Sequence, residues 1–318
     1  MNQVTFASVA YNSKKKQTRR EKFLNEMDGV IPWSLLKAVI DPVYPDIGNG
    51  RPPMSLERML RIYFMQQWFQ LSDPGMEDSL YDSESMRRFA RIELGDTPVP
   101  DETTILNFRH LLEEHNLTKQ LFETVNEYLE RNGLLLREGT IVDATIINAP
   151  PSTKNREKRR DPEMRQTKKG NQWYFGMKAH VGSDSESGLA HSITHTPANV
   201  HDSQEMEKLL HGKEKEIFGD QAYADKTKKA EFEAEGITWN VSRKASPGKA
   251  LSKRDRQWNR TRSRIRAIGE HPFGVIKHLW GYRKVRYRGI FKNACQQFTL
   301  FALANLFLTR RSILYPTA

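Results

Sequence analysis

The hydrophobic pattern of the chain changes at Gly139, and this change constrains the fold more than any other feature. Before it, apolar residues recur at the three- and four-residue spacing of amphipathic helices. After it come short runs rich in β-branched residues, separated by polar turns, which are typical of strands. The sequence therefore predicts an all-helical N-terminal region followed by a region of mixed strands and helices.

The N-terminal region contains several short helical patterns with recognisable ends. Ser55 is placed to cap a helix that runs through Gln70, and Asp101 is placed to cap another. Further helical patterns cover residues 20–38, two short stretches after a break at residues 72–75, and residues 102–114. Consecutive short helices with tight turns fit a helix-turn-helix reader of DNA, and they fit a small bundle with another purpose equally well.

The second half of the chain alternates extended and helical patterns in a definite order. Extended patterns cover residues 139–149, 173–184, 189–199, 216–220 and 237–242, and helical patterns cover residues 203–210, capped by Asp202, and 226–235. A polar, basic loop is expected over residues 150–171. The order β-β-β-α-β-α-β, followed by a long basic helical segment, predicts an α+β fold with a ribonuclease-H-like mixed sheet and flanking helices.

Positive charge is concentrated in the C-terminal half. The chain carries 50 Lys and Arg against 39 Asp and Glu, a net charge of +11. Residues 1–100 are electroneutral, residues 101–150 carry a net charge of −5, and residues 151–318 carry +16. The segment from Arg243 to Lys292 contains 16 basic residues and only two acidic ones. Because a solvated surface usually mixes charges of both signs, this run favours a phosphate backbone as the partner.

Composition excludes several other classes of protein. The single cysteine, Cys295, excludes a disulfide framework and a cysteine-based zinc finger. The longest apolar stretch, residues 298–308, is much shorter than the roughly 20 residues that span a bilayer. The first residues do not have the order of charged and apolar segments of a secretory signal. We therefore expect no membrane association and a cytoplasmic protein, associated with the nucleoid when it is bound to DNA.

Three acidic residues stand where a polar active site would need them. Asp143 interrupts a strand of β-branched residues, where an unpaired carboxylate would need a nearby cation. Alternatively, it could form a buried salt bridge or be a hydrogen-bonded aspartate at a strand edge. Asp220 ends a strand, where sites in α/β sheets open, although it could also cap a turn. Glu270 is isolated in a basic helical run, where it could also pair with Arg266 one helical turn earlier.

Together these carboxylates suit hard divalent cations. Mg²⁺ prefers a few carboxylate oxygens together with water and substrate phosphate, and two such ions can act on the attacking and leaving oxygens of a phosphoryl transfer. We therefore expect the three carboxyl groups to converge on one two-metal site. Such a site would explain acidic residues inside a basic surface.

Five segments of the chain read, in order, PPMSLERMLRIYFMQQWFQLSD, GTIVDATIINAPPSTK, DPEMRQTKKGNQWYFGMKAH, GDQAY and RAIGEHPFGVIK. They resemble segments of the bacterial DDE transposases of insertion-sequence family five, within the broader group of families four and five. The resemblance implies that Asp143, Asp220 and Glu270 form the metal-binding catalytic triad, with two Mg²⁺ or Mn²⁺ ions. It also implies cleavage of double-stranded DNA at terminal inverted repeats and strand transfer into target DNA, by a homodimer or a larger assembly.

The C-terminal signature of such transposases reads Tyr, two residues, Arg, three residues, Glu, six residues, Lys. Arg266, Glu270 and Lys277 fit this spacing, but Ser263 stands at the tyrosine position. The resemblance implies that Arg266 and Lys277 bind DNA phosphates beside the cut. The alternative is that both are ordinary members of a basic surface.

These patterns divide the chain into three expected parts: a flexible basic arm over residues 1–19, a helical domain over residues 20–136 that is a candidate for DNA-end recognition, and a catalytic domain over residues 137–318. Two other functions remain open. One is a metal-dependent nuclease on the same fold, and the other is a DNA-binding protein that has lost catalysis.

Overall fold

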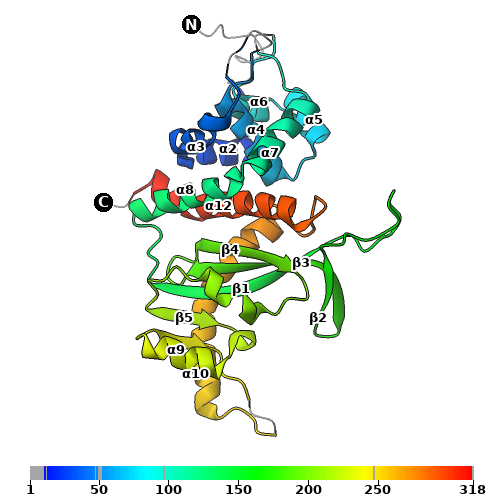
Figure 1. The fold of residues 1–318 in the computed structure, drawn as a ribbon. Coiled ribbons are helices and arrows are strands. Elements are labelled where there is room, and N and C mark those ends of the chain that lie inside the picture. The colour runs from blue at the N-terminus through cyan, green and yellow to red at the C-terminus, as the bar shows by residue number, and fades with distance from the viewer. Residues whose placement is uncertain are drawn as a thin grey trace.

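The computed structural model describes residues 11–316, except residues 12, 47, 49–51, 96, 246 and 247. A group of short helices forms one end of the molecule and a mixed sheet lies beyond it, with the long C-terminal helix between them (Figure 1). Part of the predicted basic arm, residues 1–10 and 12, lies outside the described residues. Within the described part, Lys14 forms an ion pair with Glu21.

The N-terminal region is helical from residue 19 onward. Its helices are α2 (Arg19–Val30), α3 (Trp33–Ile40), α4 (Leu56–Phe69), α5 (Asp73–Asp82), α6 (Glu84–Ala90), α7 (Glu102–Glu114) and α8 (Leu117–Arg131), with a 3-10 turn η1 (Asp41–Val43). Ser55 and Asp101 accept capping hydrogen bonds from the backbone amides of Arg58 and Thr104, as their positions predict. The N-terminal part of the sequence thus determines its helices through local caps and periodicity.

Two helix predictions need correction. The helix expected over residues 20–38 is two helices, because the chain leaves the helical conformation at Ile31 and Pro32 begins a new one. The break expected at residues 72–75 is the start of α5, where Ser72 caps the helix through the amide of Gly75. Pro74 is tolerated there because the first turn of a helix leaves its amides without intrahelical partners.

The sheet confirms the predicted α+β, ribonuclease-H-like fold. Its strands are β1 (Gly139–Asn148), β2 (Arg165–Lys169), β3 (Gln172–Asp184), β4 (Ala190–Pro197), β5 (Glu216–Gly219) and β6 (Thr238–Val241). The order is β2-β3-β1-β5-β6, with β4 also paired to β3. β3 pairs antiparallel with β1, β2 and β4. β5 pairs in parallel with β1 and with β6.

Two segments of this half differ from the prediction. The loop expected over residues 150–171 contains β2, whose polar and largely exposed residues give no alternating hydrophobic pattern. The helix expected over residues 203–210 is a pair of 3-10 turns, η2 (Asp202–Gln204) and η3 (Met206–Leu209). His201 rather than Asp202 is the cap of η2.

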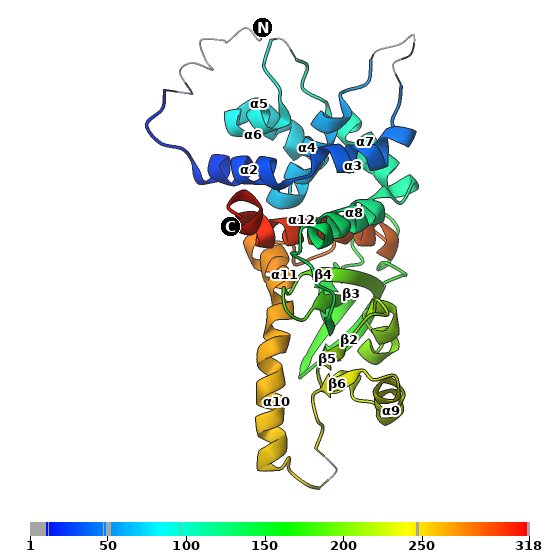
Figure 2. The ribbon, with the colours of Figure 1, turned by 90° about the vertical axis from the view of Figure 1, so that its left-hand side faces the viewer.

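The remaining helices surround the sheet. They are α9 (Lys226–Ala234), α10 (Lys253–Arg266), a 3-10 turn η5 (Ala267–Glu270), α11 (His271–Gly274), a π-helical turn η6 (Val275–Leu279) and α12 (Ile290–Leu314). Figure 2 shows α10 as a long column along one side of the sheet, leading up to α11. The structure thus runs from a basic helix directly into the turn that carries Glu270.

Helix α12 joins the two halves of the molecule. It packs against α8 and α2 on one side and against β4 on the other. Its buried Asn305 donates to the side chain of Asn126 in α8 at 2.9 Å and to the carbonyl of Ala190 in β4 at 2.7 Å. One apolar core extends from Leu24 in α2 to Val181 in β3. Among the described helices, none is long and apolar enough to cross a membrane.

Candidate active site

Parallel pairing of β1 and β5 brings Asp143 and Asp220 together. Ile141 in β1 lies opposite Phe218 in β5. Continuing this parallel register by two positions places Asp143 opposite Asp220, the residue that follows β5. Neighbouring strands lie about 4.8 Å apart, and residues two apart share a face. Two carboxylates 77 positions apart in the sequence (220 minus 143) therefore project from the same face of neighbouring chain segments.

Each of these carboxylates uses one oxygen to order its own backbone. Asp143 Oδ1 accepts from the amide of Ala144 at 2.9 Å, and Asp220 Oδ1 accepts from the amide of Ala222 at 2.7 Å. Asp220 therefore does cap a turn, η4 (Gln221–Tyr223), as its alternative interpretation predicts. Across the described residues, the second oxygen of neither carboxylate accepts a hydrogen bond. One oxygen of each is thus left to bind a ligand.

Burial shifts the ionisation of Asp143. Desolvation raises the pKa of this carboxyl from 3.8 to about 6. The amide of Ala144 and the charge of Arg266 oppose the shift, whereas the negative charges of Asp220 and Glu270 add to it. The buried salt bridge considered for Asp143 is not formed with any described residue. A half-buried carboxylate with two negative neighbours favours a bound cation, which would lower its pKa again.

Glu270 approaches this pair from the C-terminal segment. Gly269 packs so closely on β1 that a β-carbon there would lie 3.0 Å from Ile141 Cγ2, and this contact holds the turn η5 against the strand. The Glu270 side chain itself is exposed, and it forms no ion pair with Arg266 or any other described residue. Its negative charge nevertheless raises the pKa of Asp143.

The three carboxylates do not form a ready-made metal cluster. Over the described part of the chain, no group of three His, Cys, Asp or Glu side chains is placed to hold a metal ion. Asp143 and Asp220 are neighbours by strand register, and the exposed side chain of Glu270 is near enough for its charge to act on Asp143.

Arg266 and Lys277 both lie close to Asp143. Arg266 is half-buried, donates weakly to Ser242 Oγ at 3.4 Å, and lowers the pKa of Asp143 by its charge. Lys277 Nζ donates to Thr145 Oγ1 and, at 3.0 Å, to the carbonyl of Ile146, just beyond Asp143 on β1. Burial and the nearby charge of Lys169 lower the pKa of Lys277 to about 8. Both cations therefore border the carboxylates.

Helix α10 presents an unusual concentration of unpaired cations. It carries seven Lys and Arg residues and one acidic residue, Asp255, and none of its side chains is buried. Within the described ranges, none of these seven cations forms an ion pair. Ser263, at the position of the family's tyrosine, is exposed on the same helix. A polyanion is the partner that such a helix suits.

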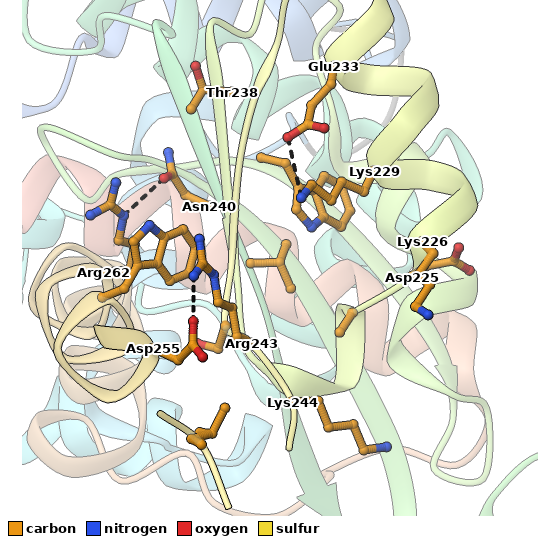
Figure 3. Close-up of a pocket in the computed structure, with 16 residues that line it drawn as sticks. Asp225, Lys226, Lys229, Glu233, Thr238, Asn240, Arg243, Lys244, Asp255 and Arg262 are labelled. Carbon is orange, nitrogen blue, oxygen red and sulfur yellow. Dashed lines mark hydrogen bonds and ion pairs between the residues drawn. The ribbon is translucent and has the colours of Figure 1, made fainter. Parts of the chain in front are cut away.

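A basic pocket of about 650 Å³ lies beside α10, between it, α9 and β6. Figure 3 shows Arg243 paired with Asp255, and Arg262 donating to Asn240, around the wall of this pocket. The guanidinium groups of Arg243 and Arg262 each lie 4.5 Å from the ring of Trp258. The positive surface of α10 therefore continues through this pocket to β6, at the edge of the sheet.

Sequence reasoning missed three residues beside Lys277. Lys169 and Tyr174, from the hairpin of β2 and β3, and Arg283, from the segment after η6, line the same pocket as Lys277. In the sequence, these residues are marked only by lying in two basic stretches. The proximity of Lys169 to Lys277 depends on the pairing of β2 with β3, which was not predicted. Arg283 is close in the sequence and donates to the carbonyl of Lys277.

This fold and site define the class of enzymes that act on the phosphodiester bonds of nucleic acids. Residues 135–306 match the family described as "Transposase DDE domain", and residues 12–111 match "Transposase domain (DUF772)". The first match alone covers more than half of the chain, so the chain belongs to the DDE transposase family. It is a DNA-cutting transposase of a mobile element, of the kind found in insertion-sequence families four and five. Members of this family generally use divalent metal ions.

Proposed function

We propose that this transposase, as a member of insertion-sequence family five, cleaves DNA at the terminal inverted repeats of its element and joins the freed 3'-hydroxyls to target DNA. The observation that carries the proposal is the alignment of Asp143 with Asp220 on parallel chain segments, where burial raises the pKa of Asp143 to about 6. A pair of adjacent carboxylates is unfavourable without a cation, and phosphodiester chemistry on DNA uses one.

The residues present fit divalent metal ions. Asp143 and Asp220 each keep one oxygen that accepts no hydrogen bond from the described residues, and Glu270 is exposed and unpaired there. Carboxylate oxygens are the protein ligands that Mg²⁺ and Mn²⁺ prefer. We assign Asp143, Asp220 and Glu270 as the ligands of two such ions. When bound, the ions activate the attacking oxygen and stabilise the leaving oxygen.

The chain's own cations orient the DNA. Arg266 and Lys277 border the carboxylates, so we assign them to the phosphates beside the cut. The unpaired cations of α10 then hold the backbone further along. The helical region over residues 20–136 is assigned to recognition of the DNA end, and residues 137–318 to catalysis. Because two ends must be joined, the working complex contains at least two copies of the chain, acting on DNA in the bacterial cytoplasm.

The test compares the native chain with Asp143→Ala, Asp220→Ala and Glu270→Ala on duplexes that carry the ends of the element encoding it, with Mg²⁺ or Mn²⁺. We expect cleavage and strand transfer by the native chain alone, and binding of the duplex by all four proteins. Glu114→Ala, an exposed change in α7, is the matched control and should leave activity intact.

The outcomes separate the three functions. A native chain that cleaves the ends but never joins a pre-cut end to target DNA is a nuclease on this fold. A chain that binds the ends but never cuts them has lost catalysis. If any of the three variants still cleaves at the native rate, the assignment of that residue as a metal ligand is wrong.

A further inference from the structure

The hairpin of β2 and β3 has two chemically different faces. Lys168 pairs with Trp173, and Thr167 pairs with Tyr174, across the two strands. Because neighbouring residues of a strand point to opposite faces, Lys169 and Tyr174 share one face, and Lys168 and Trp173 share the other. Figure 1 shows β2 hanging from the outer end of β3, away from the rest of the sheet. The face with Lys169 and Tyr174 is the one that lies beside Lys277.

That face forms one wall of a pocket of about 310 Å³ at the end of β1. The pocket begins at Thr145, two residues beyond Asp143. Three cations line it, Lys169, Lys277 and Arg283, and no Asp or Glu side chain does. The remaining lining groups, which are mostly polar, are Thr145, Ile146, Asn148, Tyr174 and His278.

The printed hydrogen bonds of Lys277 and Arg283 go to uncharged groups, and the charge of Asp143 acts on Lys277 from nearby. Lys277 donates to Thr145 and to the carbonyl of Ile146. Arg283 Nε donates to the carbonyl of Lys277 at 3.2 Å, and its Nη2 lies 3.2 Å from His278 Nδ1. No described residue forms an ion pair with Lys169, Lys277 or Arg283. The charge of Lys169 lowers the pKa of Lys277, which shows that the cations repel one another, and Asp143 offsets this only in part. An anionic ligand would remove the remaining cost.

We propose that this pocket binds a backbone phosphate of the DNA strand held at the carboxylates, close to the phosphate that is cut. Lys169 and Arg283 would contact the phosphate oxygens together with Lys277, and the hairpin would lie along the strand. The proposal rests on the proposed function, because it places the cut at Asp143 and Asp220. It adds two phosphate ligands and a hairpin to the residues that the family signature implies.

The test measures DNA binding without cleavage. Lys169→Ala and Arg283→Ala are compared with the native full-length chain on a labelled duplex carrying the element's end, in EDTA, over a series of NaCl concentrations. Lys168→Ala is the matched control, since it removes the same charge from the adjacent, equally exposed position on the opposite face of the hairpin. All of these side chains are exposed, and thermal unfolding of each variant checks that the fold is intact.

Each loss of one phosphate contact should reduce the slope of log K against log salt by about 0.9 and weaken binding roughly three- to tenfold. We expect both the smaller slope and the weaker binding for Lys169→Ala and for Arg283→Ala. For Lys168→Ala we expect less than half of the change in slope and in affinity. Ethylation of one phosphate near the cut should weaken binding of the native chain and have little further effect on Lys169→Ala.

Equal losses in Lys168→Ala and Lys169→Ala would mean a general surface charge and would overturn the proposal. Unchanged slopes in both pocket variants would overturn it as well. Because the experiment contains no metal, its result is independent of cleavage. A chain that never cuts DNA can still show the phosphate contact, and a chain that cuts DNA can still lack it.

Discussion

The buried arginines of the N-terminal helices and the cations of α10 have different surroundings. Arg61 in α4 is fully buried, pairs with Glu57 and Asp28, and lies over the ring of Trp33. Arg109 in α7 is likewise buried between two carboxylates. In contrast, the seven cations of α10 have no carboxylate partner among the described residues. The first group stabilises the fold, whereas the second is left for a ligand.

The same contrast holds for the acidic residues. Salt bridges to Lys37 and Arg61 lower the pKa of Glu57, whereas burial and negative neighbours raise the pKa of Asp143. Folding therefore pairs Glu57 and these arginines internally, whereas Asp143 and the cations of α10 form no ion pair among the described residues and are left for metal or substrate.

The largest expected effect is on catalysis. Asp143→Asn keeps the size of the side chain but removes a metal ligand, so several kcal/mol of transition-state stabilisation are lost. We expect end cleavage to fall by roughly a thousandfold or more, measured in single-turnover assays. Binding of the DNA end should stay within about threefold of native. Cleavage at a tenth of the native rate or faster would contradict the role of Asp143.

The buried ion pairs of Arg61 in the helical region should affect only the stability of the fold. Arg61→Ala leaves the charges of Glu57 and Asp28 without a buried partner and should lower the free energy of unfolding by about 3 kcal/mol or more. Arg91 also pairs with Glu57 but is 62% exposed, so Arg91→Ala should cost less than about 1 kcal/mol. Urea unfolding of both variants gives the comparison. Equal losses would mean that burial does not distinguish the two regions.

Asp143 should destabilise the metal-free fold at neutral pH. Its folded pKa, about 6, is above its ordinary value of 3.8. A raised carboxyl pKa favours folding at low pH, and that stability is lost as the pH rises through 6. Asp143→Asn should therefore be more stable than the native chain at pH 8, by up to about 3 kcal/mol.

Thermal unfolding in EDTA at pH 8 and at pH 4 tests this sign. The gain of Asp143→Asn should be present at pH 8 and absent at pH 4. Addition of Mg²⁺ should stabilise the native chain more than the variant. A variant that is less stable than the native chain at pH 8 without metal would show that Asp143 is already stabilised by the protein.

The smallest expected effect is that of a single cation on α10. Arg260 is exposed and unpaired among the described residues, so Arg260→Ala should leave thermal stability unchanged and reduce the salt slope of DNA binding by about 0.9. Arg131→Ala is the control, since this exposed residue of α8 pairs with Glu127 in the helical region. A slope change of the same size for Arg131→Ala would remove the distinction between the two regions.

Much of the fold could be predicted because it depends on local pattern. Caps such as Ser55 and the β-branched run of β1 placed the helices and strands within a few residues. The two incorrect predictions in the second half of the chain also concern local structure. β2 lacks an alternating pattern because both of its faces are largely exposed, and residues 203–210 form two short 3-10 turns instead of one helix.

The site divides in the same way. The sequence by itself determined which acids are available, Asp143, Asp220 and Glu270, and that the positive charge gathers around the last of them. Only the tertiary structure decided that Asp143 lies beside Asp220, that the side chain of Glu270 is exposed, and that Lys169 lies near Lys277. The physical reason is that residue type and periodicity are local, whereas strand register, burial and the pairing of charges arise from contacts between segments far apart in the chain.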